Sequence, residues 1–162
     1  MNTLIAYAGK TGNTAKCARR LAIRLKNVTL VDLNVEEVSP NDFDAVIVAS
    51  PVYSHKFERS VQIFLRTYQN ILENKLFAVF VTMVEYGTFN KVIAKEIAGP
   101  LRKNAVAIAN FGGEVNNLTP FGWHDKIVAK SMIKLESKKH PIEFLSEAPQ
   151  KFIEELKKVN WD

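Results

Sequence analysis

Five short apolar segments alternate along the chain with longer segments of helical periodicity. The apolar segments span residues 3–8, 28–33, 45–50, 76–84 and 105–111, and the helical ones span 13–26, 61–72, 89–102, 123–137 and 147–159. Strands that alternate with helices form parallel sheets through crossover connections. Strands buried on both faces of such a sheet lose their polar alternation, as residues 45–50 do. We therefore expect one α/β domain over residues 1–162 with a five-stranded parallel sheet.

The composition is that of an ordinary globular protein, with 47% hydrophobic and 24% charged residues. No apolar run is long enough for a transmembrane helix, and the first residues lack the pattern of a signal peptide. The single cysteine, Cys17, excludes an intramolecular disulfide framework. Three histidines and one cysteine have no metal-binding spacing. Together these features predict a cytoplasmic protein without a metal.

Positive charge gathers at the start of the chain, which has a formal net charge of +5. The first 30 residues contain no acid and six basic residues, namely Lys10, Lys16, Arg19, Arg20, Arg24 and Lys26. This block favours an anionic ligand or partner, although a solvated helix face would have the same composition. Nucleic acid is not expected as the partner, because no aromatic residues interleave the basic ones and no nucleic-acid motif is present.

A turn rich in glycine and threonine joins the first predicted strand to the first helix. It reads Gly9-Lys10-Thr11-Gly12-Asn13-Thr14. Glycine allows tight backbone turns, and the N-terminus of a helix favours an anion through its N–H groups and its dipole. The side chains of Thr11, Asn13 and Thr14 add short hydrogen-bonding groups. The turn therefore predicts a phosphate site.

Two common phosphate motifs do not fit this turn. A P-loop requires a glycine at the position of Leu4, which lies within the predicted strand. A dinucleotide fingerprint requires three glycines, whereas only Gly9 and Gly12 are present. In its residues 11–14 the turn instead resembles the Thr-Gly-Asn-Thr loop of flavodoxins.

The resemblance to flavodoxins extends over nearly the whole chain through the order of strands and helices. It implies a flavodoxin-like three-layer sandwich with strand order 2-1-3-4-5, and it implies FMN as the cofactor. The phosphate of FMN would be held by backbone N–H groups and side chains of Gly9, Lys10, Thr11, Gly12, Asn13 and Thr14. Flavodoxins usually carry Ser or Thr at the position of Gly9, so this chain lacks one hydroxyl contact. The charge of Lys10 offsets that loss if its side chain turns inward.

Flavodoxins also cover the flavin ring with two loops. By the same resemblance, the expected residues are Pro51, Val52, Tyr53 and Ser54 after the third strand and Thr82, Met83, Tyr86 and Gly87 after the fourth. Aromatic rings stack in offset geometry and exclude water, which makes Tyr53 and Tyr86 the stacking candidates. Tyrosines that merely pack at strand ends would give the same pattern.

Two segments resemble a narrower group, the menaquinone-dependent protoporphyrinogen oxidases. These are flavodoxin-like FMN proteins that oxidise a porphyrinogen and pass electrons to a quinone. Residues 49–55 are similar to their second loop. Residues 121–126 are similar to a later motif of theirs, with His124 at the position of an expected tyrosine.

The resemblances imply an FMN-dependent redox protein that serves a redox partner protein or a quinone. It would be either an electron carrier or an oxidoreductase of the protoporphyrinogen–quinone kind, and the flavin rather than a side chain would carry the chemistry. Lysines that recur every four residues predict a basic helical stripe for an anionic membrane or an acidic protein, or simply for solvent, at Lys126, Lys130, Lys134 and Lys138. A flavin-free module that binds a phosphorylated ligand or an acidic partner remains an alternative.

Overall fold

The sheet has five parallel strands at its centre. In the computed structural model, which describes residues 1–113 and 147–161, they are β1 (Thr3–Tyr7), β2 (Val28–Asp32), β3 (Ala45–Tyr53), β5 (Leu76–Thr82) and β6 (Ala107–Asn110). Their order is β2-β1-β3-β5-β6, and each neighbouring pair is parallel. A short strand, β4 (Lys56–Phe57), turns back antiparallel onto the end of β3. Since β4 lies off the main path, the predicted order 2-1-3-4-5 is confirmed.

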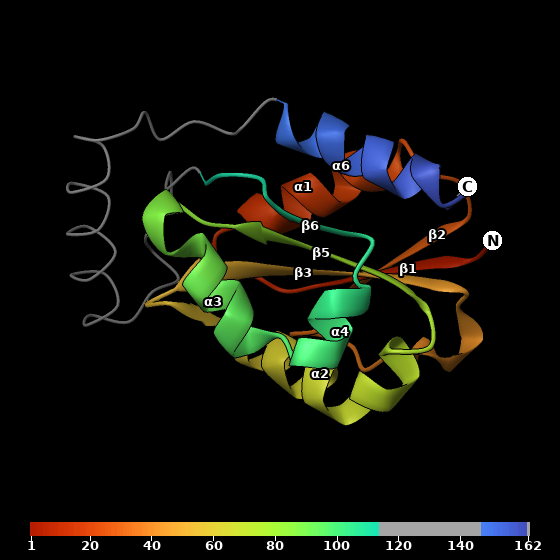
Figure 1. Cartoon of the computed structure of the whole chain (residues 1–162), viewed down its shortest axis with the longest axis horizontal. Helices are drawn as coiled ribbons and strands as arrows, with labels where there is room; N and C mark the ends of the chain where they lie inside the picture. The colour runs from red at the N-terminus through yellow and green to blue at the C-terminus, as the bar shows by residue number, and fades with distance from the viewer. Residues whose placement is uncertain (114–146, 162) are drawn as a thin grey trace.

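Helices cover both faces of this sheet and complete the three predicted layers (Figure 1). On one face lie α1 (Asn13–Ala22) and α6 (Ala148–Lys158), and on the other lie α2 (Arg59–Leu72), α3 (Phe89–Glu96) and α4 (Gly99–Asn104). Two single 3-10 turns, Pro40–Asp42 and Tyr86–Thr88, come before β3 and α3. None of the described helices is both long and apolar enough to cross a membrane.

Each central strand contributes to two separate cores. In β1, Leu4 and Ala6 pack into the core that faces α2, α3 and α4, whereas Ile5 packs into the core that faces α1 and α6. The alternation of side chains along a strand produces this division, because successive residues point to opposite faces. Both faces are therefore apolar, which explains why the strand sequences show no polar alternation.

Three aromatic rings pack together between α6 and the sheet. Phe80 of β5 stacks on Phe111, with ring centroids 4.3 Å apart, and the ring of Phe152 from α6 meets Phe111 edge-on at 5.3 Å. All three side chains are almost fully buried. Aromatic contacts of this kind add to the burial of apolar area, so α6 is held over β5 and β6 by its own apolar face.

The predicted helix over residues 89–102 is wrong in one respect, because the structure divides it into α3 and α4. Ile97 and Ala98 between them have extended backbone, with ψ of 124° and 143°. Pro100 has no N–H group, and in a continuous helix its ring would meet the carbonyl of Glu96. A new helix therefore begins at Gly99, where a proline in the first turn is tolerated.

The first helix is shorter than the predicted 13–26. It ends at Ala22. The next hydrogen bonds are of the 3-10 type, from the N–H of Arg24 to the carbonyl of Leu21 and from the N–H of Leu25 to the carbonyl of Ala22. Asn27 then takes a left-handed conformation with φ of 50°, which is incompatible with a helix.

Several expectations lie outside the described residues. These are the helix at residues 123–137, the motif at residues 121–126 and the basic stripe of Lys126, Lys130, Lys134 and Lys138. They stay predictions from the sequence.

Candidate functional site

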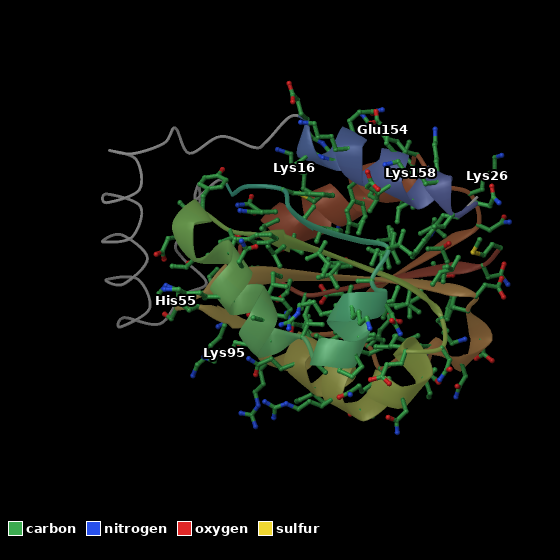
Figure 2. All side chains as sticks on the ribbon, viewed as in Figure 1. Lys16, Lys26, His55, Lys95, Glu154 and Lys158 are labelled. Atoms are coloured by element: carbon green, nitrogen blue, oxygen red, sulfur yellow. The ribbon has the colours of Figure 1, made fainter. Side chains whose placement is uncertain are left out.

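The loops that follow β1, β3 and β5 meet at the carboxyl edge of the sheet. The register aligns Tyr7 of β1 with Ala49 of β3, and Pro51 of β3 with Thr82 of β5. Figure 2 shows His55, from the loop after β3, at the end of the sheet opposite Lys26. The strand order reverses between β1 and β3, and sheets of this type bind ligands at such a reversal.

The loop between β1 and α1 has the backbone geometry of an anion site. Gly12 stands before α1 in a left-handed conformation with φ of 84°, and the first turn of the helix contains no acidic residue. The first hydrogen bond of the helix runs from the N–H of Lys16 to the carbonyl of Gly12, at 2.9 Å. The N–H groups of a first turn have no acceptor within the helix, and its dipole adds partial positive charge. An anion is favoured here on both counts.

Thr14 faces inward rather than toward solvent. Its hydroxyl lies 2.8 Å from the hydroxyl of Thr82, at the end of β5, and both side chains are buried. Gly9 leaves room for this contact, since a Cβ at Gly9 would lie 3.2 Å from Oγ1 of Thr14. The structure thus joins one residue expected at the phosphate to one expected at the ring.

Three of the predicted ring-loop residues lie in a strand rather than in a loop. β3 runs on through Pro51, Val52 and Tyr53, because it pairs with β5 and then with β4. The prediction that the third strand ends at Ser50 is therefore wrong. The turn itself is Ser54-His55, where φ is 48° and 60°, as a two-residue hairpin with left-handed centres requires.

Tyr53 lies beside the phosphate loop. The ammonium group of Lys10 stands 6.0 Å from the centre of its ring. Burial raises the pKa of Tyr53 above the ordinary value, and the charge of Glu58 adds to that shift. Neighbouring polar groups of Thr11 and of the Lys10 backbone oppose the shift. The phenol oxygen therefore lies against the loop to which the sequence assigns a phosphate.

The loop after β5 holds the remaining expected residues. Met83 is almost fully buried in the core toward α2 and α3. Tyr86 and Gly87 form the 3-10 turn that leads directly into α3, with Tyr86 half-buried. The site thus gathers residues from all three loops, and their role toward a cofactor stays a prediction.

A contact between His55 and Glu85 connects the loops after β3 and β5. Nε2 of His55 lies 3.0 Å from a carboxylate oxygen of Glu85, with the two side chains 49% and 27% exposed. At this exposure such a pair contributes about 0.2–1 kcal/mol. It therefore orients the two loops more than it stabilises the fold.

Asn110 supports the loop after β5 in a way that sequence reasoning missed. Its side-chain oxygen accepts hydrogen bonds from the N–H of Met83 at 3.1 Å and of Gly112 at 2.9 Å, and its amide nitrogen donates to the carbonyl of Met83 at 3.2 Å. The side chain thus pairs with the backbone of Met83, the first residue after β5, as a neighbouring strand would. A polar residue that ends an apolar strand was the available signal.

Ser50 and Asn34 were also missed. The hydroxyl of Ser50, fully buried within β3, accepts from the N–H of Glu58 at 2.9 Å, which fixes the entry to α2. Asn34 accepts from the hydroxyl of Ser60 at 2.8 Å and reaches the carbonyl of Gly9 at 3.5 Å. The Ser50 contact spans eight positions and the Asn34 contacts span 25 and 26, and local patterns carry no sign of either. Among the described residues, no group of three or more His, Cys, Asp or Glu side chains could hold a metal ion.

Substitution of Asn110 tests the support of the loop after β5. Asn110→Ala removes the partners of three backbone groups, so the free energy of unfolding should fall by about 1–3 kcal/mol. Urea unfolding measures this change, and hydrogen exchange at Met83 and Gly112 should quicken. Asn104→Ala, at an exposed position, is the matched control and should change stability by less than about 0.5 kcal/mol. Equal effects of the two substitutions would contradict this role.

The raised pKa of Tyr53 predicts a pH dependence of stability. The folded-state pKa of Tyr53 lies above its unfolded value. The stabilising contribution of the neutral Tyr53 to folding is therefore complete below about pH 10, and it is lost as the pH rises through the folded-state pKa. Wild-type protein should therefore lose more stability than Tyr53→Phe between about pH 9 and pH 11 in urea unfolding. Parallel losses in the two proteins would show that Tyr53 titrates normally.

Comparison with known proteins agrees with this architecture. A family model described as the flavodoxin domain matches residues 4–142. No curated protein sequence matches the chain.

Solved structures with the same fold are distant in sequence. A flavoprotein in complex with FMN from Lactobacillus acidophilus is 18% identical, with a TM-score of 0.54, and the match covers 67% of this chain and 92% of that one. The flavodoxin of Streptococcus pneumoniae is 17% identical, with a TM-score of 0.51 and coverage of 86% and 100%. A Fusobacterium nucleatum flavodoxin bound to FMN is 10% identical, with a TM-score of 0.51 and coverage of 99% and 98%. At such identities the likeness shows the fold alone. With the family match over most of its length, the chain belongs to the flavodoxin domain family.

Proposed function

We propose that this chain is an FMN-binding redox protein that transfers electrons through the bound flavin. The loop of residues 9–14 would hold the phosphate of FMN, and the loops after β3 and β5 would cover the ring. The observation that carries the proposal is the convergence of these three loops at the strand-order reversal, next to a helix N-terminus without acidic residues.

The phosphate loop supplies hydrogen-bond donors and positive charge. Backbone N–H groups of residues 10–14 and the side chains of Thr11 and Asn13 would bind the phosphate oxygens, as charge-assisted hydrogen bonds. The first acidic residue of the chain is Asp32, so the field around α1 favours a dianion. FMN complexes among the structural neighbours have this fold, which supports FMN as the cofactor.

Tyr53 and Tyr86 would border the flavin ring. Each is half-buried at the carboxyl edge, and Tyr53 already lies against residues 10 and 11. Bound FMN supplies one- and two-electron redox chemistry, while the chain binds the phosphate, excludes water from the ring and orients it. The contact of His55 with Glu85 joins the two loops that would cover the ring.

The primary proposal for the partner is a redox protein that exchanges electrons with the flavin. The hairpin at residues 49–55 resembles that of menaquinone-dependent protoporphyrinogen oxidases, which supports a quinone-linked oxidoreductase as the second proposal. Turnover of a porphyrinogen with a quinone acceptor distinguishes them, because an electron carrier exchanges electrons only with proteins.

Titration with FMN and with riboflavin tests the cofactor. Riboflavin lacks the phosphate, so its affinity should be at least tenfold lower, roughly the effect of one charge-assisted hydrogen bond. Quenching of flavin fluorescence measures both affinities. Thr11→Val should weaken FMN binding by about tenfold and leave riboflavin unchanged. Thr29→Val, in the exposed part of the edge strand β2, is the matched control.

A protein that retains neither flavin would overturn the redox proposal and would favour the flavin-free module. Equal affinity for FMN and riboflavin would show that the loop of residues 9–14 does not bind the phosphate.

A further inference from the structure

Two buried threonine hydroxyls meet beneath the phosphate loop. Oγ1 of Thr14, in the first turn of α1, lies 2.8 Å from Oγ1 of Thr82, and the side chains are only 2% and 7% exposed. The two residues lie 68 positions apart in the chain. Their contact is a side-chain hydrogen bond that joins the start of α1 to the end of β5.

Gly9 leaves space beside this contact. A Cβ at Gly9 would lie 3.2 Å from the hydroxyl oxygen of Thr14 and 3.4 Å from its Cβ. The first distance is tighter than ordinary contact, so a side chain at this position would crowd the hydroxyl pair. The chain thus lacks a hydroxyl at position 9 and has one at position 82, within hydrogen-bonding distance of Thr14.

The two hydroxyls can hydrogen-bond in either direction, and the direction decides which hydrogen stays available for a ligand. Each hydroxyl has one hydrogen to donate and two lone pairs to accept. If Thr82 donates to Thr14, the hydrogen of Thr14 remains for an acceptor in the loop. A hydroxyl that accepts one hydrogen bond is polarised and donates the next more strongly.

We propose that Thr82 is a positioning residue of the phosphate site. It holds the side chain of Thr14 in one rotamer and donates its hydrogen to Thr14, so that Thr14 donates to a phosphate oxygen. This inference rests on the proposed binding of FMN and adds Thr82 to the phosphate site, although the sequence assigned that residue to the ring. Thr82 also pairs with Pro51 in the sheet register, so the contact connects the phosphate loop to the strand that supports the ring loop.

The test compares FMN with riboflavin in Thr82→Val, which keeps the shape of the side chain and removes the hydroxyl. We expect FMN to bind about tenfold more weakly and riboflavin to bind unchanged, because only FMN carries the phosphate. Thr82→Ser should restore FMN affinity. Thr3→Val is the matched control, since the hydroxyl of Thr3 is equally buried and has no hydrogen-bond partner within the described part of the chain.

A second variant keeps the test independent of the stability of Thr82→Val. Gly9→Ala places a methyl group against the hydroxyl of Thr14, and it should also weaken FMN binding while leaving riboflavin binding unchanged. The inference is overturned if both variants bind FMN like wild type, or if they weaken FMN and riboflavin equally.

Failure of the proposed function gives a different result. If wild-type protein binds no FMN, inorganic phosphate becomes the probe, and the midpoint of thermal unfolding is measured with and without it. A phosphate-induced increase in wild type that is absent in Thr82→Val supports the role of Thr82. No increase in wild type, or equal increases in both proteins, overturns it.

Discussion

The parallel pairing of β3 with β1 on one side and with β5 on the other determines where function can reside in this molecule. Parallel strands in register end at one edge, and these three strands form the centre of the sheet. Their crossover helices cover both faces, which leaves the loops at the carboxyl edge as the place where backbone N–H groups and polar side chains meet. Without the apolar character of both faces, these helices would not pack and the loops would not converge.

The site combines local and distant contributions. The turn at Gly12 and the start of α1 arise from adjacent residues, and they create an electropositive helix end. Contacts across the fold then hold the surrounding groups, as Asn110 holds Met83 and Thr82 meets Thr14. The helix end supplies the attraction for an anion, and the distant contacts supply its geometry.

The alternation of apolar and helical segments was sufficient to predict the parallel sheet, whereas the strand order was expected from the resemblance to flavodoxins and is confirmed. The role of the loop of residues 9–14 toward a phosphate stays a prediction. Apolar runs predict buried strands, and the glycines with Asn13 and Thr14 predict the turn. The break between α3 and α4 was readable from Pro100, but a single helix over residues 89–102 was predicted. The extension of β3 to Tyr53 was missed because it depends on pairing with β4 and β5. Contacts such as that of His55 with Glu85 depend on packing between segments, which a linear pattern does not record.

The central claim is that the loop of residues 9–14 binds the phosphate of FMN. A crystal structure of the protein saturated with FMN tests it most directly. We expect a phosphate oxygen within hydrogen-bonding distance of the Thr14 hydroxyl and of the first-turn N–H groups of α1, with the ring between Tyr53 and the loop of residues 83–87. FMN bound elsewhere, with the loop of residues 9–14 unoccupied, would contradict the claim.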